Sequence, residues 1–304
     1  MSQYVTKIRT DAGDLQIDYN ALANLPALNT MFSNPNLLIN SDFRSPINQR
    51  AQNIYYGMAP KGYTIDRWCM GENDFNRTVE VVGGGVVITN PNTEYTGTFQ
   101  QIFENMLPQC DYTLSVKVAS KTGGITMSCG GSHSSIRKEL EVGINTLTLT
   151  SATINSFVIL LASNSSVKLE WAKLEVGTVA TQFSPRTYAE EVILCKRFHQ
   201  VVTLRNTDVA CYMHKRNTNE YGGTMHFEPM RTIPDVRRSG AFYVEQYNSS
   251  GQIYGITESS FTSFEMVAQW SELRFTIGLT TSDPVNYLAA ASDTIVFRFD
   301  AEIY

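Results

Sequence analysis

The chain has 304 residues, of which 42% are hydrophobic and 17% charged, with a formal net charge of −5 at pH 7. At about 100–200 residues per domain, this length predicts two domains with apolar cores. The acidic balance excludes a general nucleic-acid binder, which needs a basic face, and no apolar run reaches the roughly 20 residues of a membrane-spanning helix. The opening MSQYVTKIRTDAG lacks the apolar stretch of a secretion signal, so we expect a protein that stays inside the producing cell until lysis.

Residues 1–35 are predicted to form a separate N-terminal attachment or oligomerisation segment. Its few apolar residues before Pro26 are too few to build a core, so the segment must pack on another chain or stay mobile. The turn sequence SNPN at 33–36 marks its end.

Residues 36–185 are predicted to form a jelly-roll β-sandwich, within an all-β protein. Short strand patterns alternate with turn signals, and VEVV and VVIT flank a glycine hairpin at 83–85. YTLSVKVA (112–119) alternates apolar and polar residues, which predicts one buried face. FVILLA (157–162) is apolar throughout and predicts a central strand covered on both sides. About eight such strands favour a jelly roll.

A linking helix is predicted within 186–200, running from Thr187 to about His199. Thr187 and Glu190 have the spacing of a capping box, and the acidic first turn and basic last turn match the helix dipole. One apolar face is expected to pack between the two β regions; its members are Tyr188, Val192, Cys195 and His199.

Residues 201–304 are predicted to form a second β-sandwich, the C-terminal head. Its last strand alternates clearly, with Ile295, Phe297, Phe299, Ala301 and Ile303 facing one way and Val296, Arg298, Asp300 and Glu302 facing the other. The cysteines are expected to be reduced, buried thiols, because they are odd in number and no CxxC spacing indicates zinc. They are Cys69, Cys110, Cys129, Cys195 and Cys211.

Several stretches resemble the phage tail-fibre and receptor-binding protein family. They are NLLINSDF (36–43), YTIDRW (63–68) and LEWAKLEVGTVATQFSPRTYAEEVILCKRFHQ (169–200). In that family, a jelly roll ends in a Leu-Glu-Gly stretch and continues through ATxF and RxYxEE into a helix; the matching positions here are 174–177, 180–183 and 186–191. FEPMRTIPDV (227–236), FRFDAEIY (297–304) and the leader KIRTDAGDLQIDYNALANLP are also similar to family sequences, whereas residues 237–292 match none.

This resemblance implies a homotrimeric adhesin of the virion tail. The N-terminal segment would attach to a tail or baseplate protein, and the head would bind a host surface glycan or protein without catalysis. Neither a cofactor nor membrane insertion is implied. Two alternatives stay open: a tail-borne polysaccharide depolymerase or glycosidase, and a carbohydrate-binding module outside any virus.

Aromatic and amide side chains supply the predicted glycan contacts, since flat rings stack on sugars and amides read their hydroxyls. The candidates are Tyr55, Tyr56, Tyr63 and Trp68 in the first sandwich, and Tyr247, Asn248, Tyr254 and Trp270 in the head. For the two tryptophans, the role of core anchor is the favoured alternative. Tyr247 lies in the turn-rich QYNSSGQ, which favours exposure.

Other chemistry has weaker signals. Asp42 and Asp66 are candidate ligands of a structural calcium ion, which prefers oxygen donors. We find no GxSxG, HExxH or P-loop, and we expect His133, between Ser132 and Ser134, to be part of a solvated loop. A glycosidase pair of Asp66 with Glu72 or Asp74 stays open, because sequence does not give the separation of two carboxyl groups.

Overall fold

The computed structural model describes residues 6–10, 13–17, 33–57, 62–71, 76–205, 208–247, 250, 252–280, 283–291 and 294–303. These residues are mostly β-strands, and the chain divides into two compact units. The first unit contains the chain up to Pro46, Gln52–Thr64 and Trp68–Thr187. The second contains Ile47–Ala51, Ile65–Arg67 and Tyr188–Tyr304, so two short loops within the predicted first domain belong to the second unit.

The N-terminal part of the described chain is a β-hairpin. Strand β1 (Thr6–Thr10) pairs antiparallel with β2 (Gly13–Ile17), with Thr6 opposite Ile17. The prediction that residues 1–35 attach to another protein is not tested by this geometry.

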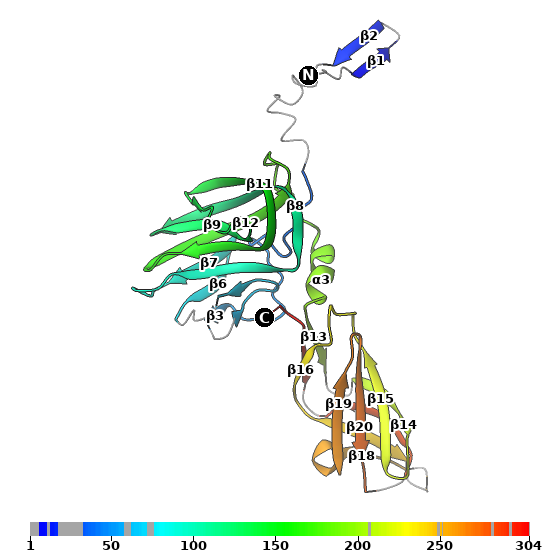
Figure 1. The fold of residues 1–304 in the computed structure, drawn as a ribbon. Coiled ribbons are helices and arrows are strands. Elements are labelled where there is room, and N and C mark those ends of the chain that lie inside the picture. The colour runs from blue at the N-terminus through cyan, green and yellow to red at the C-terminus, as the bar shows by residue number, and fades with distance from the viewer. Residues whose placement is uncertain are drawn as a thin grey trace. The chain divides into compact units, whose positions relative to one another are not determined.

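The first unit is a jelly-roll β-sandwich built around one long antiparallel sheet (Figure 1). Its strands follow the spatial order β10-β9-β11-β8-β12-β7-β6-β3, with β5 pairing to β8 and β4 to β5. The strands are β3 (Ile54–Tyr56), β4 (Gly62–Tyr63), β5 (Cys69–Met70), β6 (Thr78–Val82), β7 (Gly85–Asn90), β8 (Gly97–Thr122), β9 (Ile125–Gly131), β10 (Lys138–Glu139), β11 (Gly143–Leu161) and β12 (Ser165–Val176).

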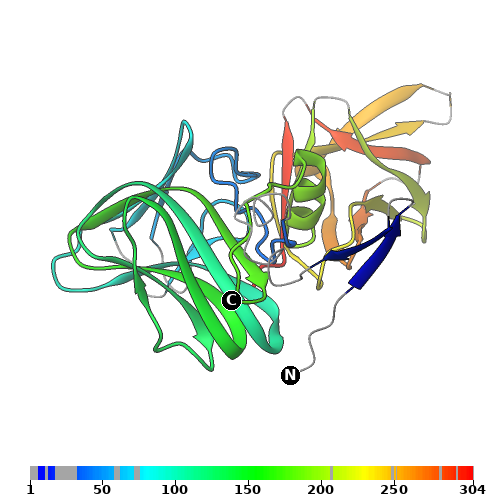
Figure 2. The ribbon, with the colours of Figure 1, turned by 90° about the horizontal axis from the view of Figure 1, so that it is seen from above.

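The longest strands, β8 and β11, bend where their register shifts. Between Leu149 and Ser156 the pairing slips at three bulges, so each strand changes direction there. Bending lets one pair of strands serve both layers of the sandwich, whose strands curve around a common interior when seen from above (Figure 2).

Several predicted strand features are confirmed. The glycine hairpin joins β6 to β7, with Val82 opposite Gly85 and a positive φ of 74° at Gly84 that suits glycine. FVILLA lies in β11, between β8 and β9. Its second face, however, is half-buried rather than fully covered.

Two of the three residues on the predicted polar face of YTLSVKVA, Thr113 and Ser115, are also buried, and Lys117 is half-buried. Thr113 and Ser115 are covered because residues 177–183 lie over this face, and the Thr113 hydroxyl donates to the Gly177 carbonyl at 2.7 Å. The Lys173 ammonium anchors this covering segment: it donates to Thr181 Oγ1 at 2.6 Å and pairs with Glu175 at 3.1 Å.

The same region explains several residues that carry the family resemblance. Phe183 stacks on Trp171 with ring centroids 4.7 Å apart and 4° between their planes. The Arg186 guanidinium donates to the carbonyls of Leu38, at 2.8 Å, and Asn36. These contacts hold the end of the first unit against its first loop, so the motifs serve the local architecture.

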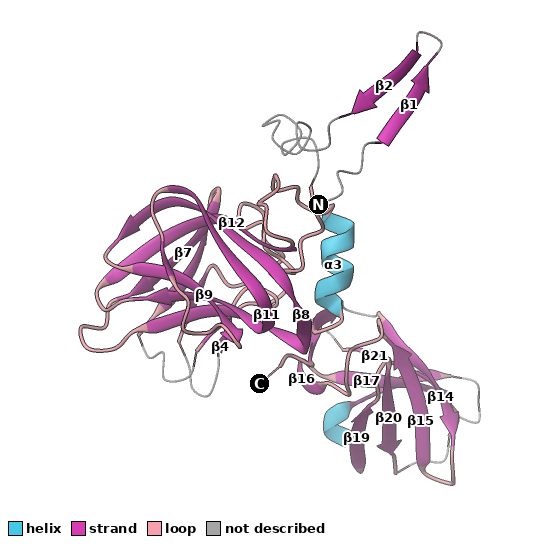
Figure 3. Ribbon diagram, turned by 45° about the horizontal axis from the view of Figure 1, so that its top comes forward, coloured by secondary structure: helices cyan, strands magenta, loops and turns pink. Residues whose placement is uncertain are grey.

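The second unit consists of one helix, among the described residues, and two sheets that share a core (Figure 3). One sheet has the order β13-β22-β16 and the other β18-β17-β21-β14-β15-β20-β19. The elements are α3 (Tyr188–Lys196), β13 (His199–Leu204), β14 (Val209–Lys215), β15 (Glu220–His226), β16 (Asp235–Ser239), β17 (Phe242–Tyr247), β18 (Ile253–Thr257), a 3₁₀ turn η1 (Glu258–Ser260), β19 (Ser263–Ala268), β20 (Glu272–Gly278), β21 (Val285–Ala290) and β22 (Ile295–Asp300).

The predicted helix is present but shorter and more exposed than expected. It ends at Lys196, and His199 begins β13 instead. Of its predicted apolar face, Cys195 is buried, Val192 is half-buried and Tyr188 is 72% exposed. Burial raises the pKa of the Cys195 thiol, so this group is a core residue rather than a nucleophile.

The last strand follows its predicted alternation up to Asp300, with Ile295, Phe297 and Phe299 fully buried. Glu302, predicted to lie on the opposite face, is buried as well, and it forms ion pairs with Arg67 at 2.6 Å and Arg50 at 3.4 Å. No disulfide joins the five cysteines, all of which lie in the described ranges; four are buried and Cys110 is half-buried.

Candidate functional site

Two of the four aromatic candidates in the first unit are core residues, which corrects their assignment as glycan contacts. Trp68 is fully buried, its ring lies 4.9 Å from that of Phe99, and its indole N–H donates to the Asn40 carbonyl at 2.8 Å. Tyr55 is also buried, since alternation along β3 turns it inward. Tyr56 is exposed on the same strand and Tyr63 is half-buried on β4, so the four side chains do not form one platform.

Two of the four candidates in the head, Tyr254 and Trp270, have side chains that the structure describes, and these two lie on different parts of the sheet. Tyr254 is half-buried and its hydroxyl donates to the Asp283 carboxylate at 2.9 Å, which indicates a structural contact. Trp270 is exposed in the turn between β19 and β20, at the opposite edge of the sheet from β17 and β18. The side chain of Tyr247 and the whole of Asn248 lie outside the described residues.

The structure places the two candidate calcium ligands in different units, each beside an arginine. Asp42 pairs with Arg44 at 2.6 Å in the first unit, whereas Asp66 pairs with Arg50 at 3.2 Å in the second. Within the described ranges, no group of three or more His, Cys, Asp or Glu side chains could hold a metal ion.

The catalytic alternatives find little geometric support. Glu72 and Asp74, the suggested partners of Asp66, lie outside the described residues. The Ser132 hydroxyl lies 2.7 Å from His133 Nδ1, but the two are adjacent residues of a turn, with Ser132 exposed and His133 half-buried. The Ser132 oxygen also accepts the Thr153 N–H at 3.0 Å, so it serves as a local structural contact.

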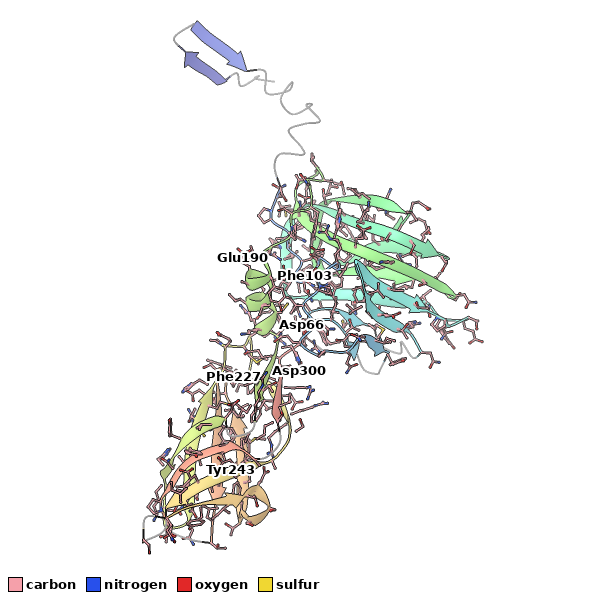
Figure 4. All side chains as sticks on the ribbon, turned by 180° about the vertical axis from the view of Figure 1, so that it is seen from behind. Asp66, Phe103, Glu190, Phe227, Tyr243 and Asp300 are labelled. Atoms are coloured by element: carbon pink, nitrogen blue, oxygen red, sulfur yellow. The ribbon has the colours of Figure 1, made fainter. Side chains whose placement is uncertain are left out.

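A buried charged cluster lies in the second unit and was missed by the sequence analysis. The Arg67 guanidinium donates to Glu302 at 2.6 Å and stacks 3.6 Å from the centre of the Phe198 ring. Arg50 bridges Asp66 and Asp300, at 3.2 and 3.7 Å, and both carboxylates are labelled in Figure 4. Three carboxylates thus face two guanidinium groups. No signal in the sequence pairs residues 235 positions apart, so only the fold could reveal this cluster.

The electrostatics of this cluster are strongly perturbed. Burial, opposed by Arg50 and Gln49 and reinforced by the Glu302 carboxylate, raises the pKa of Asp66 to about 7. His199 is nearly fully buried, and neither ring nitrogen has a hydrogen-bond partner among the described atoms. Burial, together with the charges of Arg50 and Arg298, lowers the pKa of His199 to about 3. Asp66, Arg67, His199 and Glu302 are all buried, so we interpret the cluster as structural.

The strongest candidate for a binding site is a row of side chains on the outer surface of the second unit, which we call the tyrosine face. It comprises Tyr212 on β14, Tyr243 and Glu245 on β17, and Asn286 and Tyr287 on β21. Tyr212 lies opposite Tyr287, and Tyr287 lies opposite Glu245. Opposed residues of antiparallel strands share a face of the sheet, with Cβ atoms about 5 Å apart.

Side-chain alternation places this row outside. Cys211, Met213, Phe242 and Val244 are buried, so their neighbours Tyr212, Tyr243 and Glu245 point outward. Tyr212 is 76% exposed, and Tyr243, labelled in Figure 4, is half-buried. The rings of Tyr243 and Tyr287 meet edge to face, with centroids 6.3 Å apart.

A bulge in β21 adds a polar group to the face. Glu245 pairs with Tyr287 and Gln246 with Val285, so Asn286 is an extra residue without a partner in this ladder. Bulges re-aim side chains, and here the Asn286 amide donates to Glu245 Oε1 at 3.4 Å. The Tyr287 hydroxyl donates to the other carboxylate oxygen. This hydrogen bond and burial raise the pKa of Tyr287, so the phenol stays protonated as a donor.

Sequence analysis missed the tyrosine face, although part of its signal was present. ACYMHK and AFYVEQY alternate apolar and polar residues, which places Tyr212, Tyr243 and Glu245 on outer faces. The contact between the two stretches through β21 depends on strand order, and this order is not encoded in local periodicity. All members except Tyr212 fall in 237–292, where the family resemblance is absent.

Taken together, the fold and this face define an all-β protein whose exposed site is suited to binding. Aromatic rings beside a hydrogen-bonded carboxylate can hold a polar ligand with an apolar face. Among the described residues, no helix is long and apolar enough to cross a membrane.

Comparisons with known proteins add no identification. No protein-family model matches the chain, and no curated protein matches it. Solved structures similar to it include wild-type discoidin II from Dictyostelium discoideum, with 10% identity, a TM-score of 0.19 and coverage of 74% of this chain and 80% of that one. The N-terminal CBM22-1-CBM22-2 tandem domain of Paenibacillus barcinonensis Xyn10C has 8% identity, a TM-score of 0.27 and coverage of 88% and 98%. At these TM-scores the likeness carries no argument about function.

Proposed function

We propose that this protein is a non-catalytic adhesin that binds a cell-surface glycan, and that it serves as a receptor-binding subunit of a phage tail. The tyrosine face is the observation that carries the binding proposal. Its Tyr212 ring is 76% exposed, whereas Tyr residues usually bury much of their apolar surface. An exposed, amphipathic tyrosine beside further rings and a carboxylate is typical of recognition surfaces.

The assignment to a phage tail is supported by the sequence resemblance at 36–43, 63–68 and 169–200. We further propose that the protein acts as a homotrimer attached to a tail or baseplate protein through residues 1–35. An isolated two-stranded hairpin such as β1–β2 is marginally stable in water, which favours packing against another chain. Location in the virion tail follows from the same proposal.

Whole-cell binding tests the proposal. Fluorescently labelled protein would be incubated with a panel of bacterial strains, with the wild type beside Tyr212→Ala and a matched control, Tyr188→Ala. Tyr188 is 72% exposed on α3, so its loss removes a comparable ring away from the tyrosine face. We expect binding to at least one strain, strong loss with Tyr212→Ala and no loss with Tyr188→Ala.

Two further measurements separate the alternatives. Reducing ends released from purified capsule would demonstrate a depolymerase and contradict the non-catalytic proposal. Sedimentation equilibrium at micromolar concentration should give the mass of three chains, and a monomer would contradict the trimer. A wild-type protein that binds no cell of the panel would contradict the adhesin itself.

A further inference from the structure

Three properties of the tyrosine face restrict the ligand it can bind: where its carboxylate lies, which acceptor positions are used, and what flanks it. If the protein binds a glycan, as proposed above, these properties define the chemical class of that glycan.

Glu245 is held in place while keeping hydrogen-bonding capacity. Tyr287 and Asn286 each donate to one carboxylate oxygen. A carboxylate offers about four acceptor positions, so about two stay available on this half-buried group. Because both neighbours donate, the remaining positions require donors from a ligand. Sugar hydroxyls are such donors, and charge-assisted bonds to a carboxylate are stronger than neutral ones.

The strand beside Glu245 leaves room for a ligand. Gly255 on β18 lies directly opposite Glu245 and is exposed, so the row has no side chain at this position. A Cβ atom at Gly255 would lie 3.4 Å from Tyr243 Cδ2, an ordinary contact, and the residue has no positive φ. Glycine is therefore not required by the backbone here, and a larger residue would occupy the space beside the carboxylate.

On the other side of Glu245, the rings supply an apolar surface. Tyr287 lies next to Glu245 in the row and Tyr212 lies next to Tyr287. A pyranose ring can place its C–H face on a tyrosine while its hydroxyls reach the carboxylate. A uronic or sialic acid would bring a second negative charge to the same place, and like charges at short distance repel.

We infer that the tyrosine face binds an uncharged, hydroxyl-rich saccharide, with Glu245 accepting hydrogen bonds from its hydroxyls, and that it discriminates against acidic glycans. The net charge of −5 acts in the same direction at longer range.

The test measures affinities of the full-length protein for immobilised neutral polysaccharides (mannan, galactan, glucan) and acidic ones (polyuronate, polysialate). Wild type should bind a neutral glycan and bind the acidic ones more weakly. Tyr212→Ala should weaken neutral binding at least about fivefold, as truncation of an exposed aromatic anchor does. Tyr188→Ala should leave it unchanged.

Two variants test the carboxylate and the space beside it. Glu245→Gln keeps the shape of the side chain but removes its negative charge. It should therefore weaken binding of neutral glycans and raise the ratio of acidic to neutral binding. If Glu245 had only a structural role, this ratio would not change. Gly255→Val should block binding without altering any member of the face. Unchanged melting temperatures would establish that all variants are folded.

Preferential binding of acidic glycans by wild type, or no binding to either class, would overturn the inference. So would neutral binding that survives Tyr212→Ala and Gly255→Val. A different result would reject the adhesin proposal, namely the absence of cell binding by wild type. Equal binding of cells by wild type and Tyr212→Ala would instead leave adhesion intact and reject the tyrosine face as the binding site.

Discussion

Replacing His199 by Gln should add a pH dependence to the stability of the second unit, in a range where the contributions of His199 and Asp66 cancel in wild type. His199 and Asp66 have opposite perturbations: burial lowers the first pKa to about 3 and raises the second to about 7. On folding, His199 therefore releases a proton and Asp66 takes one up. Between about pH 4 and 6.5 these two effects cancel, because stability changes with pH only through the difference in bound protons.

The magnitudes follow from the shifts. The Asp66 pKa rises from 3.8 to about 7, which corresponds to about 4 kcal/mol of stability that is present below pH 4 and lost as pH rises to 7. The His199 pKa falls from 6.5 to about 3, which corresponds to about 5 kcal/mol that is present above pH 6.5 and lost as pH falls to 3.

His199→Gln removes one of the two opposing effects. The unfolding free energy of the variant should fall, relative to wild type, by about 3 kcal/mol between pH 4 and 6.5, at about 1.4 kcal/mol per pH unit. Asp66→Asn removes the other effect, so its stability relative to wild type should rise by a similar amount over the same range. Comparison with wild type cancels the contribution of other carboxylates.

Urea unfolding, followed by fluorine NMR of fluorotryptophan-labelled protein, measures this. Trp270 lies in the second unit, whereas Trp68 and Trp171 lie in the first, so their signals report the two units separately. The ring resonances of His199 should also stay at their neutral positions down to about pH 4. A difference between His199→Gln and wild type that does not vary with pH, or an imidazole that titrates near its usual pKa, would refute the reasoning.

Three other predictions concern stability. Arg67→Met should destabilise the second unit by about 3 kcal/mol in denaturant unfolding, because the buried Glu302 would lose its cation at 2.6 Å and keep only Arg50 at 3.4 Å. Adding Glu302→Leu should recover most of the loss, and a double variant no better than the single would contradict this. Lys173→Met should lower the unfolding free energy of the first unit by a similar amount, because Glu175 would lose its buried cation, and adding Glu175→Leu should restore most of it. Unchanged stability of Lys173→Met would show that the segment 177–183 does not depend on this pair. Gly131→Ala should lower the melting temperature strongly, because Gly131 has a φ of 105° and a Cβ atom there would lie 2.2 Å from the Thr153 carbonyl oxygen. Gly255→Ala should change the melting temperature little. Equal effects of the two variants would argue against backbone strain at Gly131 as the cause.

The family resemblance and the candidate site lie in different parts of the chain. Phe183 and Arg186, which carry the resemblance, stack on Trp171 and bind backbone carbonyls, so they stabilise the first unit. Tyr243 and Tyr287 lie in the stretch without resemblance. Such a separation is expected when related proteins keep the same architecture but differ in their binding surfaces.

Local patterns in the sequence were sufficient for the elements of the fold. Alternation predicted β22 up to Asp300 and the buried face at 112–118, because a strand turns successive side chains to opposite faces. The glycines between two strand patterns predicted the hairpin. Burial of Trp68 was weighed correctly as an alternative, but its role was not decided, since a tryptophan suits both a core and a sugar platform.

The tertiary structure alone decided what lies beside what. Periodicity placed Glu302 on the face opposite Phe297 and Phe299, but it cannot register Arg67, a partner 235 positions away. For the same reason, Asp66 was considered a calcium ligand before Arg50 was seen to neutralise it. The tyrosine face depends on β21 lying between β14 and β17, an order set by packing of the whole unit. Periodicity along a chain determines which way a side chain points, whereas its chemical neighbours depend on contacts between distant segments.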